Sequence, residues 1–244
     1  MVSFGPETIL SIGSVKVTNT LLDTLVVDII LIGGSYFVSK KISAVPNLVQ
    51  ASIESLVEIF YNLTESVAEN RSAKIFPYVI TFFLFILLAN WTGLIPGFGT
   101  VGFFEDHKFI PILRSATSDL NTTLALALVS FFATHIMSVK TVGVKDYLSR
   151  YFSFNPLNLS IGVLEIITEI TKVISLSFRL FGNIFAGEVV LTTVSSIFAF
   201  LFPLPFLMLE VIVGAVQALV FSMLTMAFMA ILTTPHHSAK EVKA

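Results

Sequence analysis

Long apolar stretches dominate this sequence and restrict what it can fold into. The longest covers residues 155–233 and is broken by the segment FPLPF, where Pro203 and Pro205 cannot continue a helix without losing backbone hydrogen bonds. Inside a membrane every backbone polar group must be satisfied by the chain itself, which leaves helices and closed barrels. Because the stretches are continuously apolar over about 20 residues or more, they favour helices. We therefore predict an all-α polytopic membrane protein.

The composition agrees with this prediction and excludes several functions. Hydrophobic residues make up 55% of the 244 residues and charged residues 12%, with a mean hydropathy of +0.90, which is outside the range of soluble domains. The 14 Lys and Arg are balanced by 16 Asp and Glu, so nothing indicates a nucleic-acid partner. The chain lacks Cys, and its four His lack metal-ligand spacing. We expect no metal, no cofactor and no catalytic residue, and we expect the partners to lie in or beside the bilayer.

The apolar stretches divide a single membrane domain, residues 1–244, into segments. We predict a first span at 21–38, middle spans at 75–95 and 120–139, and two helices within 155–233. A polar, glycine-rich stretch at 96–118 connects the middle spans. Lys40 and Lys41 follow the first span and Arg150 lies beyond the third, so the positive-inside rule places both of these segments in the cytoplasm.

Residues 46–70 have a different pattern from the spans. Apolar residues recur at helical spacing while glutamates occupy the other faces. We predict an amphipathic helix on the membrane surface, since it lies between two spans. The alternative is an ordinary soluble amphipathic helix.

The segment 155–233 is too long to stand upright as two spans. At 1.5 Å per residue, the part before the proline break would measure about 69 Å, whereas the hydrocarbon is about 30 Å thick. We predict a strongly tilted or bent helical hairpin, because such a tilt requires a neighbour that shapes the packing.

Charged residues form a stripe on the first helix of this hairpin. Arg179 has no acid three or four residues away in its own helix, so a carboxylate partner must come from another helix or another chain. Glu188 points to the opposite side of this helix, and Glu210 and Gln217 share a face of the next one. The stripe itself contains Glu165, Glu169, Lys172, Arg179 and Asn183.

This layout predicts two offset proton paths kept apart by a fixed positive charge. Carboxylates flank Arg179 toward both ends of the helix, and a cation repels protons and interrupts a continuous path. Lys172 has a second interpretation, because a pair with Glu165 or Glu169 could be purely structural. Asp119 and Asn121, at the outer end of their span, either line the entry path or cap the helix.

The sequence SLSFRLFGNIFAGE, which contains Arg179, strongly resembles the signature of subunit a of F-type ATP synthases. The segments QALVFSMLT, FPYVITFFLFILLANWTGLIPG and SDLNTTLALAL also resemble that family, so the likeness covers most of the chain and is weakest in the first fifty residues. It implies one membrane-surface helix and five membrane helices, the last two forming a tilted hairpin against the c-ring. It further implies a non-catalytic subunit whose partners are the c-ring, the peripheral-stalk b subunits, membrane lipid and protons.

The resemblance also assigns roles to individual residues. Arg179 matches the essential arginine, and Asn183 and Gln217 match its polar neighbours. Glu165 matches the inner carboxylate, while Glu188 and Glu210 match the outer pair, at one position of which some family members carry a His.

From these residues and the resemblance we expect an ion-translocating stator subunit with Arg179 between two proton half-channels. The alternative is an ion-coupled secondary transporter, although such proteins usually show paired halves. We expect H⁺ as the coupling ion, with Na⁺ left open because the ion site lies in the c-ring. The chain suits a bacterial inner membrane, and an organellar inner membrane is the alternative.

Overall fold

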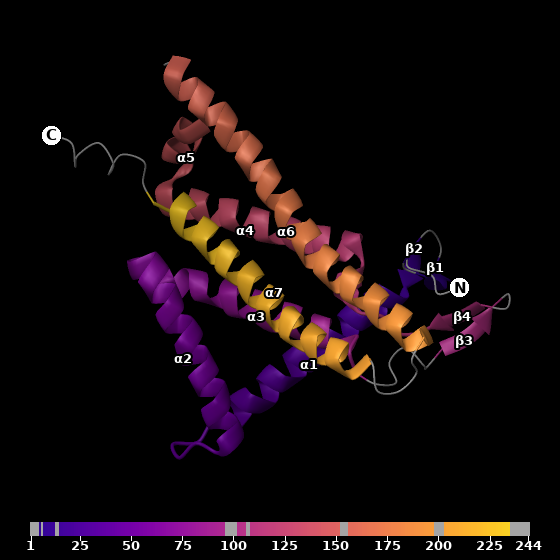
Figure 1. Ribbon diagram of the computed structural model, residues 1–244. Coiled ribbons are helices and arrows are strands. Elements are labelled where there is room, and N and C mark those ends of the chain that lie inside the picture. Colours follow the sequence, from indigo (N-terminus) through magenta and orange to yellow (C-terminus); the bar gives the residue numbers. More distant parts are fainter. Residues whose placement is uncertain are drawn as a thin grey trace.

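The computed structural model describes residues 5, 7–12, 15–95, 102–105, 108–151, 156–197 and 203–234 (Figure 1). These residues are mostly helical, which confirms the prediction of an all-α polytopic membrane protein. The helices are α1 (Asn19–Lys40), α2 (Leu48–Ala68), α3 (Ser72–Thr92), α4 (Leu120–Val142), α5 (Val144–Tyr151), α6 (Pro156–Ile197) and α7 (Pro203–Leu232), with the short 3₁₀ turns η1 (Glu69–Arg71) and η3 (Ala116–Ser118).

Four helical stretches in the described ranges are long and apolar enough to cross a membrane. They are Asn19–Lys40, Leu48–Thr92, Leu120–Val142 and Pro203–Leu232. The second combines α2 and α3, which meet at Glu69, a residue with a φ of 47°. Helix α6, which carries the charged stripe, is not among the four. The count of five membrane helices therefore stays a prediction.

Two small antiparallel hairpins, which do not follow from the sequence pattern, accompany the helices. Strand β1 (Thr8–Ile12) pairs with β2 (Val15–Thr18), and β3 (Gly102–Glu105) pairs with β4 (Lys108–Pro111). Both lie at the end of the molecule that carries the N-terminus (Figure 1). The second hairpin falls within the stretch that was read as a polar connection. We call the end with the hairpins the outer end and the end with α5 the inner end.

The core lies where α3 and α7 pack together. Ile75, Val79 and Phe82 of α3 are buried, as are Phe221 and Met226 of α7. Helix α4 packs against α6 and α7, and α6 also contacts α7. In a bilayer, packing and interhelical hydrogen bonds drive this association, since lipid is as apolar as the side chains. The long helix α6 therefore packs against both α4 and α7.

A close approach of α3 and α7 shows how that packing is made specific. Asn90 Nδ2 donates a hydrogen bond of 2.8 Å to the carbonyl of Gly214, and Trp91 Nε1 donates one of 3.2 Å to the carbonyl of Val211. A Cβ added at Gly214 would lie 3.1 Å from Asn90 Cβ. A small residue is therefore needed at this crossing.

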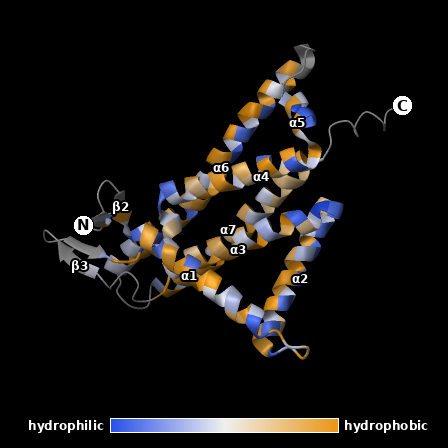
Figure 2. Cartoon of the chain, turned by 180° about the vertical axis from the view of Figure 1, so that it is seen from behind, coloured by the Kyte–Doolittle hydropathy of each residue, from blue (hydrophilic) through white to orange (hydrophobic). Residues whose placement is uncertain are grey.

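Apolar side chains also cover much of the outside. On α1, Ile29 and Ile32 are each 70% exposed and Phe37 is 65% exposed. Figure 2 shows hydrophobic residues along the helices, whereas hydrophilic ones gather at α5 and at the end of α2 that joins α3. Helix α2 contacts α3 through its second half, where Phe60, Thr64 and Ala68 are buried. Its placement on a membrane surface remains a prediction.

Candidate functional site

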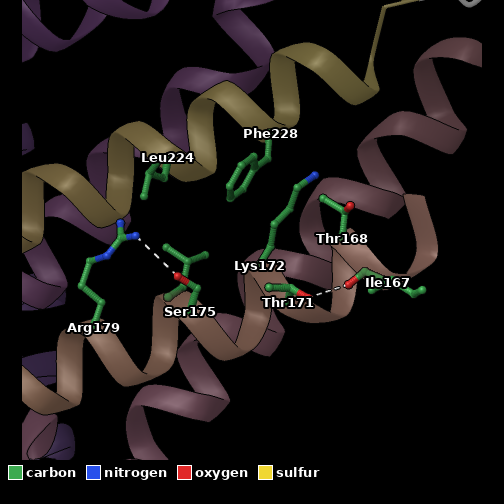
Figure 3. A pocket seen from close by; sticks show the side chains of 9 residues that line it. Ile167, Thr168, Thr171, Lys172, Ser175, Arg179, Leu224 and Phe228 are labelled. Atoms are coloured by element: carbon green, nitrogen blue, oxygen red, sulfur yellow. Dashed lines mark hydrogen bonds between the residues drawn. The ribbon is translucent and has the colours of Figure 1, made fainter. Parts of the chain in front are cut away.

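Arg179 lies on the exposed side of α6 and faces a groove between α6 and α7 (Figure 3). Its Nη2 donates a hydrogen bond of 3.4 Å to Ser175 Oγ, one turn earlier. In the part of the chain that the structure describes, no carboxylate forms an ion pair with this guanidinium. An always-charged side chain is therefore presented at an apolar surface with only a hydroxyl beside it.

The groove has a volume of about 290 Å³ and carries two cations on its α6 wall. Lys172 and Arg179 are separated by seven residues, about 10 Å along the helix axis. Lys172 Nζ lies 4.6 Å from the centroid of the Phe228 ring, a distance suited to a cation–π contact. The lining residues are Ile167, Thr168, Thr171, Lys172, Ser175, Leu176, Arg179, Leu224 and Phe228.

Lys172 is paired with Glu169 rather than Glu165. Its Nζ lies 2.7 Å from Glu169 Oε1, across one helical turn. The other carboxylate oxygen of Glu169 lies 3.7 Å from Nε2 of His135 on α4. Of the two pairs considered from the sequence, the structure therefore contains the local one. It adds His135, one of the four His, which lack metal-ligand spacing in the sequence.

Glu165 has a different cation beside it. Arg150 of α5 places its Nε 3.7 Å from Glu165 Oε1, and its Nη2 donates a 3.1 Å hydrogen bond to the carbonyl of Thr234. Arg71 donates two hydrogen bonds of 3.2 Å to the hydroxyls of Thr233 and Thr234. Glu165 thus lies at the inner end, where α5 and the end of α7 are held together.

At the outer end, Glu188 is paired with Arg114. The distance from Arg114 Nη2 to Glu188 Oε2 is 2.9 Å, and the side chains are 7% and 33% exposed. Arg114 also donates to Ser118 Oγ at 3.1 Å and to the carbonyl of Gly5 at 2.8 Å. Arg114 could not be predicted from the sequence, because nothing in the local pattern indicates that a residue of the polar connection reaches α6.

Glu210 approaches α6 directly beside Glu188. It is 6% exposed, and a Cβ added at Gly187 would lie 2.5 Å from Glu210 Oε1. Within the described ranges, Glu210 Oε2 is buried and has no hydrogen-bond partner. The structure therefore brings the predicted outer pair together from two helices, with Gly187 providing the space.

A buried polar layer joins α1, α3 and α4 near the same end. Asp119 accepts hydrogen bonds from the Asn121 backbone at 3.0 Å, as the cap of α4, and from Thr20 Oγ1 at 3.2 Å. Asp23 is fully buried and accepts from Thr92 Oγ1 at 3.0 Å and from the Ala116 backbone at 2.9 Å. Asp119 therefore does cap its helix. Asp23 belongs to this layer, although in the sequence it only interrupts a span.

The remaining predicted residues, Asn183 and Gln217, stand apart from these pairs. Asn183 is exposed on α6, one turn beyond Arg179, and Gln217 is half-buried on α7. In the described chain neither side chain forms a hydrogen bond. Both are available to a group that approaches from outside the chain.

The chain is similar to a group of known proteins over almost its whole length. Residues 21–230 match the family model described as ATP synthase A chain. ATP synthase subunit a of Moorella thermoacetica is 32% identical over 225 residues, which are 92% of this chain and 95% of the relative. Subunit a 2 of Pelobacter propionicus is 31% identical over 92% of this chain and 90% of the relative. Subunit a 1 of Hahella chejuensis is 32% identical over 91% and 86%.

Proposed function

The chain belongs to the ATP synthase A chain family, and on this premise we propose that it is the ion-translocating stator subunit of a rotary F-type ATP synthase. The proposal depends mainly on the environment of Arg179. This residue is exposed at a groove and has no ion pair in the described chain, while carboxylates lie toward both ends of its helix. A second protein that brings a carboxylate past this groove would supply the missing partner. The family favours this function over an ion-coupled secondary transporter.

In this proposal the chain has five membrane helices, α1, α3, α4, α6 and α7, with α2 on the membrane surface. Helix α6 has 42 residues, which at 1.5 Å per residue is about 63 Å, roughly twice the thickness of the hydrocarbon. It must therefore lie strongly tilted. Together with α7, which it contacts, it forms a tilted hairpin that faces the c-ring.

Protons enter at the outer end past Glu188 and Glu210 and reach a carboxylate of the c-ring. Glu210 packs against Gly187, the neighbour of Glu188 in the chain, and Arg114 forms an ion pair with Glu188. A carboxyl group can both accept and donate a proton, so the pair suits a relay that an amide could not replace. Asn183 and Gln217 then provide neutral polar groups near the approaching ring.

Arg179 separates the two half-channels by its charge. The guanidinium cannot lose its proton, and it favours the deprotonated form of a carboxylate that passes it. A c-ring carboxylate therefore gives up its proton before it reaches Arg179 and takes a new one after it. A direct leak between the half-channels would have to carry a proton past a fixed positive charge.

Protons leave at the inner end, near Glu165. This carboxylate is partly exposed and is flanked by Arg150, so the exit lies where the positive-inside rule places the cytoplasm. The proposed setting is a bacterial inner membrane with H⁺ as the coupling ion. The c-ring, the peripheral-stalk b subunits and lipid are the partners, and nucleotide chemistry belongs to other subunits.

Two measurements test this function. Purification in mild detergent should co-isolate the chain with a ring of small two-helix proteolipids, and the complex in vesicles should synthesise ATP when a H⁺ gradient is imposed. A Na⁺ gradient alone should drive no synthesis. A chain that purifies alone and binds a solute would instead indicate a secondary transporter.

A further inference from the structure

A cluster of titratable side chains lies behind the groove at the inner end, and the path proposed above does not use it. It consists of His135 on α4, Tyr147 and Tyr151 on α5, and Glu169 and Lys172 on α6. We call it the inner cluster. Three helices contribute to it, and its contacts are ordered from the groove toward α5.

The order of contacts begins at the groove wall. Lys172 Nζ contacts Glu169 Oε1 at 2.7 Å, and Glu169 Oε2 faces His135 Nε2 at 3.7 Å. On the other side of the imidazole, His135 Nδ1 shares a hydrogen bond of 2.9 Å with the hydroxyl of Tyr147. Four groups that can hold a proton therefore lie in sequence from the groove to α5, namely Lys172, Glu169, His135 and Tyr147.

The middle of this string is buried. The side chain of Glu169 is 8% exposed and that of His135 is 13% exposed. Nε2 of His135 is buried and makes no hydrogen bond in the described chain, and an unpaired buried nitrogen carries a cost in stability. The gap of 3.7 Å to Glu169 is about 1 Å longer than a hydrogen bond, so a small side-chain movement or one bridging water would join the two groups.

Glu169 is better placed than Glu165 to take up a proton near Arg179. It lies ten residues before Arg179, about 15 Å along the axis, whereas Glu165 lies fourteen residues before it, about 21 Å. Glu165 is also 26% exposed beside Arg150. Glu169 is therefore the more enclosed of the two carboxylates and the nearer to Arg179.

We propose that Glu169 is the first proton acceptor of the inner half-channel and that His135 relays its proton toward α5. This deepens the proposed function and rests on it. Protonated Glu169 gives its proton to Nε2 of the neutral imidazole, which leaves a carboxylate beside Lys172 and an imidazolium. The imidazolium then releases its Nδ1 proton to the oxygen of Tyr147, while the hydroxyl proton of Tyr147 passes to water at the inner surface. The imidazole is left protonated at Nε2 and must return to its Nδ1-protonated tautomer before it accepts the next proton.

The charged and titratable groups around His135 come from three helices. On α6, Glu169 and Lys172 bring one negative and one positive charge to the same side of the imidazole. On α5, burial and the neighbouring Tyr147 raise the pKa of the Tyr151 hydroxyl above its ordinary value, so this phenol stays neutral. On α4 itself the nearest charge is Lys140, and the described part of α7 carries no charged residue except Glu210 at the other end. The imidazole therefore faces one ion pair, that of Glu169 with Lys172, and Arg150 and Glu165 pair with each other nearby.

The test compares variants of the whole ATP synthase in vesicles, at fixed membrane potential and fixed outer pH. The inner pH is varied from about 5.5 to about 8.5, the range in which histidine titrates. We expect His135→Gln, whose amide can still bond Tyr147, to slow ATP synthesis about three- to tenfold and to flatten the inner-pH profile. The response to outer pH should stay as in the parent complex.

Further variants separate a relay from a structural role. Tyr147→Phe keeps the ring contacts with His135 and Tyr151 and should also weaken the inner-pH dependence, whereas Tyr61→Phe on exposed α2 should not. An inner-pH profile of assembled His135→Gln that coincides with the parent profile would overturn the relay. If that variant does not assemble, an unchanged profile of Tyr147→Phe would overturn it instead.

Arg179→Gln, measured in parallel, reports on the proposed function itself. Coupled synthesis by that variant contradicts the stator function, whatever the histidine variants do. If Arg179→Gln loses coupled synthesis while the inner-pH profile of His135→Gln stays as in the parent complex, only the relay is contradicted.

Discussion

The two ends of α6 both hold acidic residues beside cations, but they are built differently. At the outer end Arg114 reaches Glu188 from 74 residues away, at 2.9 Å, and is itself 7% exposed. At the inner end Lys172 reaches Glu169 across one turn of the same helix, and the ion pair of Arg150 with Glu165 is longer, at 3.7 Å. The outer site therefore depends on long-range packing, whereas much of the inner site is local.

This difference has a physical consequence for how each end tolerates change. Removing one partner of a buried pair leaves an uncompensated charge, which typically costs about 3–5 kcal/mol, whereas exposed pairs contribute about 0–1 kcal/mol. Glu188 is 33% exposed, so its cost should fall below the buried range. The outer end should still be the more sensitive of the two, because Arg114 also donates hydrogen bonds to Ser118 and to the carbonyl of Gly5.

The largest effect is expected at Arg179, which belongs to neither end. Arg179→Gln should abolish coupled ATP synthesis and allow passive proton leak, because the charge itself is the barrier. Arg179→Lys should not restore normal coupling, since an ammonium is compact, more strongly hydrated and able to lose its proton when desolvated. ATP synthesis and the decay of a pH gradient in vesicles measure both effects. Full coupling by Arg179→Gln would show that Arg179 does not separate the half-channels and has only a structural role.

The next largest effect should come from the outer ion pair. Arg114→Met should slow proton translocation about tenfold or more and lower the thermal stability of the complex, because Glu188 loses its cation. Adding Glu188→Gln should recover the stability but not the transport, since an amide cannot relay a proton. Thermal unfolding and proton pumping of the single and double variants give the coupling between the two residues. Equal stability of all the variants would show that the outer pair is not structurally important.

A smaller effect is expected from the space between the outer glutamates. Gly187→Ala would place a Cβ 2.5 Å from Glu210 Oε1, so the carboxylate must move. Because that carboxylate is the end of a flexible side chain, the cost in stability should be small. Proton transport should slow a few-fold. Gly33→Ala on α1 is the matched control, because a Cβ there meets nothing within 4 Å. Transport rates of the two variants that agree within error would show that the position of Glu210 is not critical.

The smallest effect is expected at Glu165, the partly exposed carboxylate of the inner end. Glu165→Gln should reduce ATP synthesis only modestly, most visibly at low proton-motive force, because a solvated exit can pass protons without an obligatory carboxylate. Its ion pair with Arg150 is partly exposed and should contribute about 1 kcal/mol or less. Synthesis rates at several imposed gradients measure the effect. Complete loss of transport in a normally assembled complex would make Glu165 obligatory. The inner end would then be more sensitive to substitution than the outer end.

The sequence by itself determined the helical class and the stripe on α6. Apolar runs of span length and the helical period are local properties, so residues such as Glu165, Lys172 and Arg179 share a face by their spacing alone. The same local rule allowed the pair of Lys172 with Glu169, which lies one turn away. The two hairpins were not predicted because strands of four or five residues are too short to establish a period-two pattern.

Only the tertiary structure decided which residues meet from different elements. Arg114 reaches Glu188, Glu210 packs on Gly187, His135 faces Glu169, and Asp23 is buried under Ala116 and Thr92. None of these contacts follows from spacing, because each depends on how α1, α3, α4, α6 and α7 pack around one another. A buried polar group needs a hydrogen-bond partner, and the fold determines which residue provides it. The sequence therefore shows which groups need a partner, and the packing of the helices decides which partner each one has.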